Sequence, residues 1–181
     1  KFVYNLSLTA ENHFSNKEYK EAKKTLKKFK KEDDLYYWYR LKKEAQIIAK
    51  QRNKKESLNY ITSNFDNIKQ PNRRMILDIA NFYKNSKKYE KAAKYYSEII
   101  NSLNKDPQIK SDVLYRRGGS YERLGNYEDA DKDLLNSLKI NPNDAYVLNY
   151  LAYSWLERDY KINEAIEMLE TAYALKSNDP Y

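Results

Sequence analysis

The sequence predicts an all-α fold in which about five helical hairpins stack into a solenoid. Three observations favour it: evenly spaced prolines, small residues that recur with a period of about 35 residues, and a charged composition poor in glycine. Of the 181 residues, 33% are charged and 41% hydrophobic, with three glycines and four prolines. A chain of this length can bury a core of its own.

The four prolines divide the chain at nearly equal intervals. They stand at 71, 107, 142 and 180, separated by 36, 35 and 38 residues. Because proline interrupts helices and disfavours helical geometry in the residue before it, each proline is expected near the end of a unit. Between prolines, two amphipathic stretches flank a short polar turn. The interval predicts repeats at about 3–36, 38–71, 73–106, 111–144 and 145–179.

Small side chains recur at the eighth and twentieth places of these units. Where two helices cross closely, a side chain larger than a methyl group would push the backbones apart. The second unit has Ser57 at its twentieth place, and the fifth reaches its small residue after a one-residue insertion near Lys161. The predicted packing residues are Ala10, Ala45, Ala80, Gly118 and Ala152 at the eighth place, and Ala22, Ala92, Ala130 and Ala165 at the twentieth.

All three glycines lie within the stretch "RRGGSYERLGNYEDA", residues 116–130. A phosphate-binding loop would need a preceding strand and a following Lys-Ser/Thr pair, and neither is present. Gly118 is therefore interpreted as a helix-crossing position and Gly125 as a turn residue. Gly119 leaves two hypotheses open: it makes room for a ligand, or for a neighbouring tyrosine.

The fourth unit, "SDVLYRRGGSYERLGNYEDADKDLLNSLKINPND", resembles a tetratricopeptide repeat. The fifth, which opens "AYVLNYLAYSW", is similar to repeats in alphaproteobacterial tetratricopeptide-repeat proteins of unassigned function, and the third matches through "YEKAAKYY". This resemblance implies a right-handed α-solenoid of about ten helices in antiparallel pairs, in which the first helix of each hairpin lines an inner groove. It also implies protein or peptide binding.

No catalytic site, metal site or cofactor is predicted. His13 is the one histidine and there is no cysteine, so neither a histidine metal pair nor a Ser-His-Asp triad can be built. The carboxylates of "NYEDADKD" are expected on a solvated helix surface. The longest apolar runs are far shorter than a membrane span requires. We therefore do not expect an enzyme.

The inner groove is the predicted binding site. Tyrosine offers a large contact area at low entropic cost, which favours the tyrosines of the fifth unit as anchors; the alternative, that some of them only pack on the adjacent repeat, stays open. A basic clamp for a peptide C-terminus is not expected, because Asp78 and Asp112 occupy two of its positions. The predicted groove residues are Tyr115, Arg116, Tyr146, Asn149, Tyr150, Tyr153, Lys42, Lys43 and Asn81.

The charge is unevenly distributed, which raises two alternatives. Residues 1–110 hold 26 Lys/Arg against 13 Asp/Glu, whereas residues 111–181 hold 8 against 13. The basic half could bind nucleic acid or an anionic surface, but no aromatic platform accompanies its lysines. These are interpreted as a solvated outer helix face: Lys23, Lys24, Lys27, Lys28, Lys30 and Lys31.

The second alternative is self-association at the C-terminal end. Without a polar cap, the last helix is expected to leave Leu169, Ala172 and Leu175 partly uncovered. The sequence begins at Lys1 rather than methionine, so we expect a fragment of a longer chain or a processed form. Cytoplasmic and periplasmic locations both stay open, since a targeting segment would precede these residues.

Overall fold

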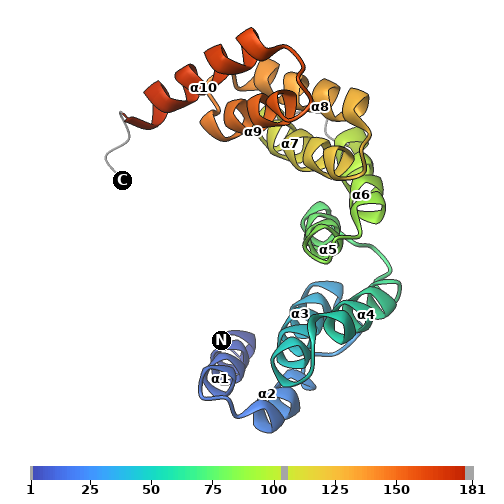
Figure 1. Ribbon diagram of the computed structural model, residues 1–181. Coiled ribbons are helices and arrows are strands. Elements are labelled where there is room, and N and C mark those ends of the chain that lie inside the picture. The colour runs from blue at the N-terminus through green and yellow to red at the C-terminus, as the bar shows by residue number, and fades with distance from the viewer. Residues whose placement is uncertain (1, 103–105, 178–181) are drawn as a thin grey trace. The chain divides into compact units, whose positions relative to one another are not determined.

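A computed structural model describes residues 2–102 and 106–177, and these ranges contain ten helices and no strand (Figure 1). The predicted all-α fold class is confirmed. The chain divides after Ser86 into two compact units. Within each unit, the first and second helices of the predicted repeats alternate along the chain.

The first unit contains five helices. They are α1 (Phe2–Ser15), α2 (Tyr19–Leu26), α3 (Asp34–Gln51), α4 (Lys54–Phe65) and α5 (Arg73–Asn85). Helix α1 packs on α2, and α3 packs on α4, as hairpin partners do, while α2 contacts α3 and α4 contacts α5.

The second unit also contains five helices. They are α6 (Tyr89–Ser102), α7 (Pro107–Arg123), α8 (Tyr127–Ile140), α9 (Ala145–Leu156) and α10 (Ile162–Ser177). Helix α7 packs on α8 and α9 packs on α10, and α7 also packs on α6. The third predicted repeat thus has its two helices in different units.

Asparagine and aspartate side chains start five of the helices. Asp33 accepts hydrogen bonds from the backbone N–H groups of Leu35 and Tyr36, both at 3.1 Å. Such caps satisfy N–H groups that have no partner inside the helix. The same arrangement starts α4, α5, α7 and α9, through Asn53, Asn72, Asp106 and Asp144.

The start of α7 shows what one of the four prolines does. Helix α7 begins at Pro107, before the predicted start of the fourth repeat at Ser111, and is capped by Asp106. Proline is favoured at the first position of a helix, where the backbone N–H has no intrahelical partner and the fixed φ suits the helix. Pro107 therefore starts a helix rather than closing the preceding unit.

The hairpin turns of four predicted repeats share a left-handed residue at the fifteenth place. Its φ is +62° at Lys17, +58° at Lys87, +76° at Gly125 and +51° at Asp159. The second repeat differs, with a φ of −129° at its fifteenth place. Glycine adopts the left-handed conformation without steric cost, and other residues do so rarely. Gly125 is therefore a turn residue, as predicted. The fifth repeat has the longer turn, with a second left-handed residue at Lys161.

The nine predicted packing residues are all buried. A Cβ atom added at Gly118 of α7 would lie 3.0 Å from Cγ of Leu134 and 3.2 Å from the carbonyl oxygen of Ala130, both on α8. At these distances a methyl group fits only if the neighbouring atoms of α8 give by a few tenths of an ångström. In the second repeat, Ser57 takes the place of alanine and its hydroxyl donates to the carbonyl of Ala45 at 2.6 Å. The small side chain there also bonds the two helices together.

A buried ion pair joins three helices of the second unit. Arg117 of α7 donates two hydrogen bonds to Asp133 of α8, at 2.6 and 2.7 Å, and a third to Ser97 of α6 at 2.9 Å. Asp133 is only 3% exposed. Bidentate pairing of this kind fixes the geometry of the partners, so Arg117 sets how α6, α7 and α8 align.

We expect alanine substitutions at the two adjacent glycines of α7 to have opposite effects. Gly118→Ala should lower the free energy of unfolding by about 1–2 kcal/mol, because the added methyl overpacks the crossing with α8. Gly119→Ala should raise it by about 0.5–1 kcal/mol, because alanine favours the helix. Its Cβ would lie 3.4 Å from the hydroxyl of Tyr150, an ordinary contact.

Urea denaturation followed by circular dichroism measures both variants, and each is the control for the other. Equal effects at the two positions would show that helix propensity alone acts there.

Candidate functional site

The first helices of the first unit form one polar-lined face. Between α1 and α3, Glu11 pairs with Lys43 and accepts a hydrogen bond from the hydroxyl of Tyr39 at 3.4 Å. Between α3 and α5, Asp78 accepts hydrogen bonds from Lys42 at 2.7 Å and from the indole N–H of Trp38 at 3.0 Å. We use the name first-helix face for each unit by itself: the surface over α1, α3 and α5 in the first unit, and the surface over α7 and α9 in the second.

A pocket of about 260 Å³ lies on this face in the first unit. It is smaller than the roughly 300–1,000 Å³ typical of small-molecule sites, so it suits one or two side chains of a peptide. Arg74 at its rim is exposed and forms no ion pair with any residue in the described ranges. Ser7, Tyr36, Trp38, Tyr39, Met75 and Leu35 also line the pocket.

The predicted cations of this face are already engaged. Lys42 is neutralised by Asp78, and Lys43 by Glu11 beside the ring of Phe14. Burial, together with the carboxylate of Glu11, raises the pKa of Tyr39 to about 12. The third predicted residue, Asn81, lies half-buried on α5. Arg74, which is not one of the predicted groove residues, is an exposed cation at this pocket without an ion pair in the described ranges.

Helix α9 presents a stripe of uncovered side chains in the second unit. Tyr146, Asn149 and Tyr153 follow one another at helical spacing and are exposed, the two tyrosines by 68% and 54%. The ammonium of Lys176 lies 4.1 Å from the centroid of the Tyr146 ring. These three residues, called the α9 stripe below, have the exposure that contact with a partner requires.

Tyr150 of the same helix packs inward instead. Its ring meets that of Tyr115 edge-on, with centroids 5.7 Å apart, and its hydroxyl donates to Glu122 at 2.9 Å. The ring lies over Gly119, so the neighbouring tyrosine fills the space that this glycine leaves. Burial and the bond to Glu122 raise the pKa of Tyr150. Tyr115 and Tyr150 therefore join α7 to α9, leaving the α9 stripe to the solvent.

The remaining predicted residue, Arg116, pairs with Asp112 one turn earlier in α7, at 2.9 Å. Of the nine predicted groove residues, Lys42, Lys43 and Asn81 lie in the first unit and the other six in the second. Within the second unit the structure brings Tyr115 and Tyr150 into contact. It leaves Tyr146, Asn149 and Tyr153 together on one side of α9.

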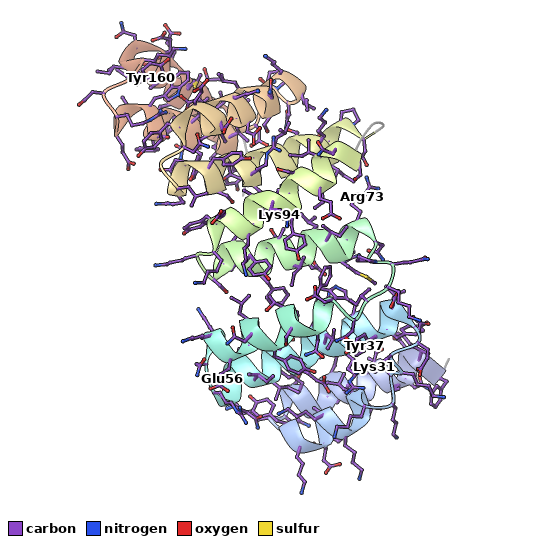
Figure 2. All side chains as sticks on the ribbon, turned by 90° about the vertical axis from the view of Figure 1, so that its right-hand side faces the viewer. Lys31, Tyr37, Glu56, Arg73, Lys94 and Tyr160 are labelled. Atoms are coloured by element: carbon purple, nitrogen blue, oxygen red, sulfur yellow. The ribbon has the colours of Figure 1, made fainter. Side chains whose placement is uncertain are left out.

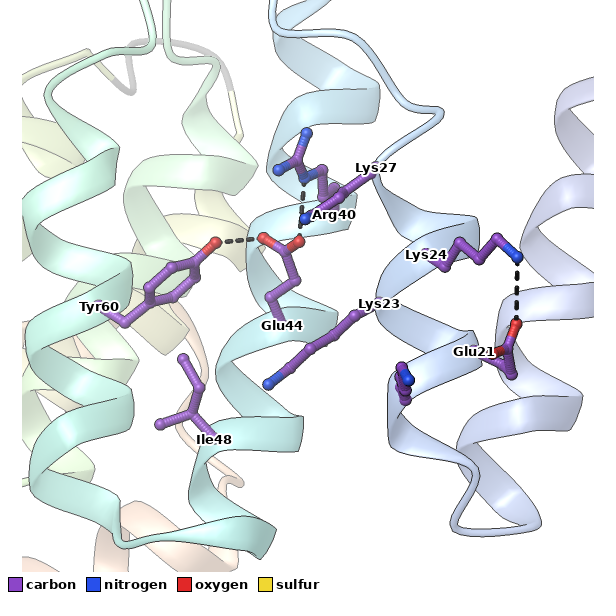
Figure 3. A pocket seen from close by; sticks show the side chains of 9 residues that line it. Glu21, Lys23, Lys24, Lys27, Arg40, Glu44, Ile48 and Tyr60 are labelled. Atoms are coloured by element: carbon purple, nitrogen blue, oxygen red, sulfur yellow. Dashed lines mark hydrogen bonds and ion pairs between the residues drawn. The ribbon is translucent and has the colours of Figure 1, made fainter.

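The N-terminal lysines that were interpreted as a solvated outer face are exposed, except for Lys23, which is half-buried. Lys23 and Lys27 of α2 point across a cleft toward α3, where Arg40 and Glu44 lie (Figure 3). Lys31 lies beside Tyr37, with its ammonium 5.6 Å from the ring centroid (Figure 2). Sequence periodicity could not reveal this, because the cleft is formed by three helices whose packing sets its walls.

At the C-terminal end, the expectation for α10 is partly wrong. Ala172 is buried, whereas Leu169 and Leu175 are half-buried. In the described ranges, no three histidine, cysteine or carboxylate side chains come together as a metal site would require. Within the same ranges, every helix is too short or too polar to cross a bilayer.

Comparison with known proteins identifies the repeats. Residues 74–102 and 111–144 each match a family model described as tetratricopeptide repeat. Over 80 residues, 44% of the chain, the sequence is 41% identical to a tetratricopeptide-repeat-containing protein of Methanocaldococcus jannaschii. The matched stretch is only 13% of that archaeal protein. The predicted resemblance to tetratricopeptide-repeat proteins is confirmed, and its alphaproteobacterial part stays a prediction.

Solved structures share the fold. MamA from Desulfovibrio magneticus RS-1 superimposes with a TM-score of 0.74 at 12% identity, covering 98% of this chain and 97% of that one. The Cut9–Hcn1 hetero-tetramer of the APC/C gives 0.63 at 17% identity, covering 94% of this chain and 33% of that one. At such low identity the likeness is one of fold.

We expect Tyr150→Phe to lower the free energy of unfolding by about 0.5–1.5 kcal/mol at neutral pH, because Glu122 loses its donor. It should also flatten the loss of stability above about pH 10, where the phenol of the unfolded chain ionises. The raised pKa means that the folded state keeps this proton longer, so stability falls as pH rises through that range.

Urea titrations at several pH values test both effects. The matched control is Tyr153→Phe, which removes an exposed hydroxyl and should change stability by less than about 0.5 kcal/mol. Identical behaviour of the two variants would show that the bond to Glu122 contributes nothing.

Proposed function

Because this chain carries tetratricopeptide repeats, we propose that it is a non-catalytic scaffold that binds a protein or peptide partner on its first-helix face. The proposal takes the repeats at about 3–36, 38–71, 73–106, 111–144 and 145–179 as its structural units. Stacked helical repeats use one extended surface for recognition.

The observation that carries the proposal is the α9 stripe. Tyr146 and Tyr153 are more than half exposed, although they lie beside the core residues Val147, Leu151 and Ala152. Large aromatic side chains contribute most to binding where a partner can cover them. Tyr150, fixed by Glu122 and Tyr115, supplies a rigid floor from which the stripe projects. A preorganised surface loses little entropy on binding.

The pocket of the first unit supports the same function and indicates what a partner offers. Its aromatic walls suit an apolar side chain, and the unpaired Arg74 at its rim suits a carboxylate. Asp78 cannot attract a cation strongly, since Lys42 and Trp38 already satisfy it. The preferred partner is therefore a peptide segment in which an apolar residue neighbours an acidic one.

The two alternatives receive less support. A nucleic acid would need a series of stacking surfaces along its path, and the exposed aromatic residues of the α9 stripe are not accompanied by a row of unpaired cations. Self-association through α10 would rest on Leu169 and Leu175, which are already half-buried.

We expect Tyr146→Ala combined with Tyr153→Ala to weaken partner capture at least about tenfold while leaving helical content unchanged, because both side chains project into solvent. The immobilised protein is incubated with lysate of the source organism, and the retained proteins are quantified by mass spectrometry.

Tyr173→Ala serves as the control, since it removes a tyrosine of α10 in the same unit that is 77% exposed, more than either tyrosine of the stripe. If the double variant retained the same proteins in the same amounts as the wild type, the α9 stripe would not be the binding surface.

A further inference from the structure

A second surface lies on the opposite helices of the first unit. A cleft of about 800 Å³ opens between α2 and α4, with α3 as its floor (Figure 3). Arg40, Glu44 and Ile48 follow one another at four-residue spacing along that floor, and Tyr60 lines the α4 side. This basic cleft shares no lining residue with the first-helix face, so it is independent of the proposed function.

The carboxylate on the floor is internally satisfied. Glu44 is 6% exposed, pairs with Arg40 at 3.1 Å and accepts the hydroxyl of Tyr60. Burial and this bond raise the pKa of Tyr60, so the phenol remains a donor. Because Arg40 and Glu44 cancel each other, the charge that an incoming ligand meets is set by the lysines of α2.

Those lysines carry uncompensated positive charge. Lys20 and Lys27 form no ion pair with any residue that the structure describes, and Lys23 bonds only the neutral amide of Gln51, at 3.0 Å. Lys24 pairs with Glu21 at 3.8 Å, an exposed contact that contributes little. Residues 1–86 hold 20 Lys/Arg against 10 Asp/Glu. The electrostatic field around the cleft is therefore positive as well.

The lysines also have a regular spacing. Lys20 and Lys23 of α2 and Lys27, its C-terminal cap, follow one another on the side that lines the cleft and extend over about 10 Å. The floor between α2 and α4 offers Ile48 and the ring of Tyr60 as apolar contacts. We propose that the basic cleft binds an acidic amphipathic helix of a protein partner, whose carboxylates face the lysines of α2 and whose apolar side chains lie on Ile48 and Tyr60. Helices commonly bind grooves in this way.

A protein helix fits the cleft better than a nucleic acid does. Tyr60 is the one aromatic ring that lines the cleft, and its hydroxyl is held by Glu44. Binding of single strands generally uses successive rings for successive bases.

The test uses a fluorescein-labelled peptide of about 15 residues, long enough to form an isolated helix, with leucine on one side and glutamate on the other. Its binding to the whole chain is followed by fluorescence anisotropy. We expect Lys20→Glu combined with Lys27→Glu to weaken binding at least about tenfold, because two unpaired attractions become repulsions.

The matched control is Lys28→Glu combined with Lys30→Glu. It makes the same change in net charge at two exposed lysines next to α2 that do not line the cleft. We expect this control to weaken peptide binding by less than about threefold, because it changes only the electrostatic field of the whole molecule. Circular dichroism establishes that both variants are folded, and Tyr146→Ala with Tyr153→Ala should bind the peptide as the wild type does.

Three results would overturn the proposal. The first is equal weakening by the cleft and control variants, which would mean that net charge alone attracts the peptide. The second is unchanged binding of a peptide in which glutamine replaces every glutamate. The third is tighter binding of a labelled oligothymidylate than of the acidic peptide, with the same dependence on Lys20 and Lys27, which would assign the cleft to nucleic acid.

Discussion

The close approach of two helices within each hairpin is the constraint on which the rest of the structure depends. At Gly118 an added methyl group would be in tight contact with α8, and in the second repeat the hydroxyl of Ser57 bonds α4 to α3. Such contacts fix the distance between first and second helices. Because that distance is fixed, the outward positions of each helix are also fixed, and the first-helix face and the basic cleft follow from it.

Buried core residues and exposed candidate binding residues alternate along the same helices, rather than lying on separate helices. Helix α9 shows this within one turn, where Leu151 and Ala152 are buried, Tyr150 packs on α7, and Tyr153 projects into solvent. The basic cleft shows the same division on α2, where Ala22 and Leu26 belong to the core and Lys23 and Lys27 line the cleft. A single helix can therefore hold the stack together and present a recognition surface.

The hairpins were predictable because their signals are local. A small residue at a fixed place and an asparagine or aspartate before a helix act within one repeat, and the sequence displays them directly. The start of α7 was harder to predict because Pro107 can either end one helix or begin the next, and Asp106 decides between these by capping. The burial of Ala92 and Ala165 followed from spacing alone.

The binding surfaces were less predictable because they depend on contacts between repeats. Lys42 was predicted to line the groove, and only the structure shows that Asp78, 36 residues away, neutralises it. Tyr150 and Tyr153 look equivalent in the sequence, yet only one of them reaches Glu122 across the repeat boundary. Position in a repeat indicates which side a residue faces. It does not indicate which side chains of the adjacent repeat lie opposite that residue and contact it.

The pairing of Gly119 with Tyr150 limits how this sequence can drift during evolution. The phenol ring occupies the volume above the glycine, so a branched or aromatic residue at position 119 would collide with it. Such a residue becomes tolerable only where position 150 has first become smaller. In descendants of this chain the two sites should therefore vary together, although 31 positions separate them and they belong to different repeats.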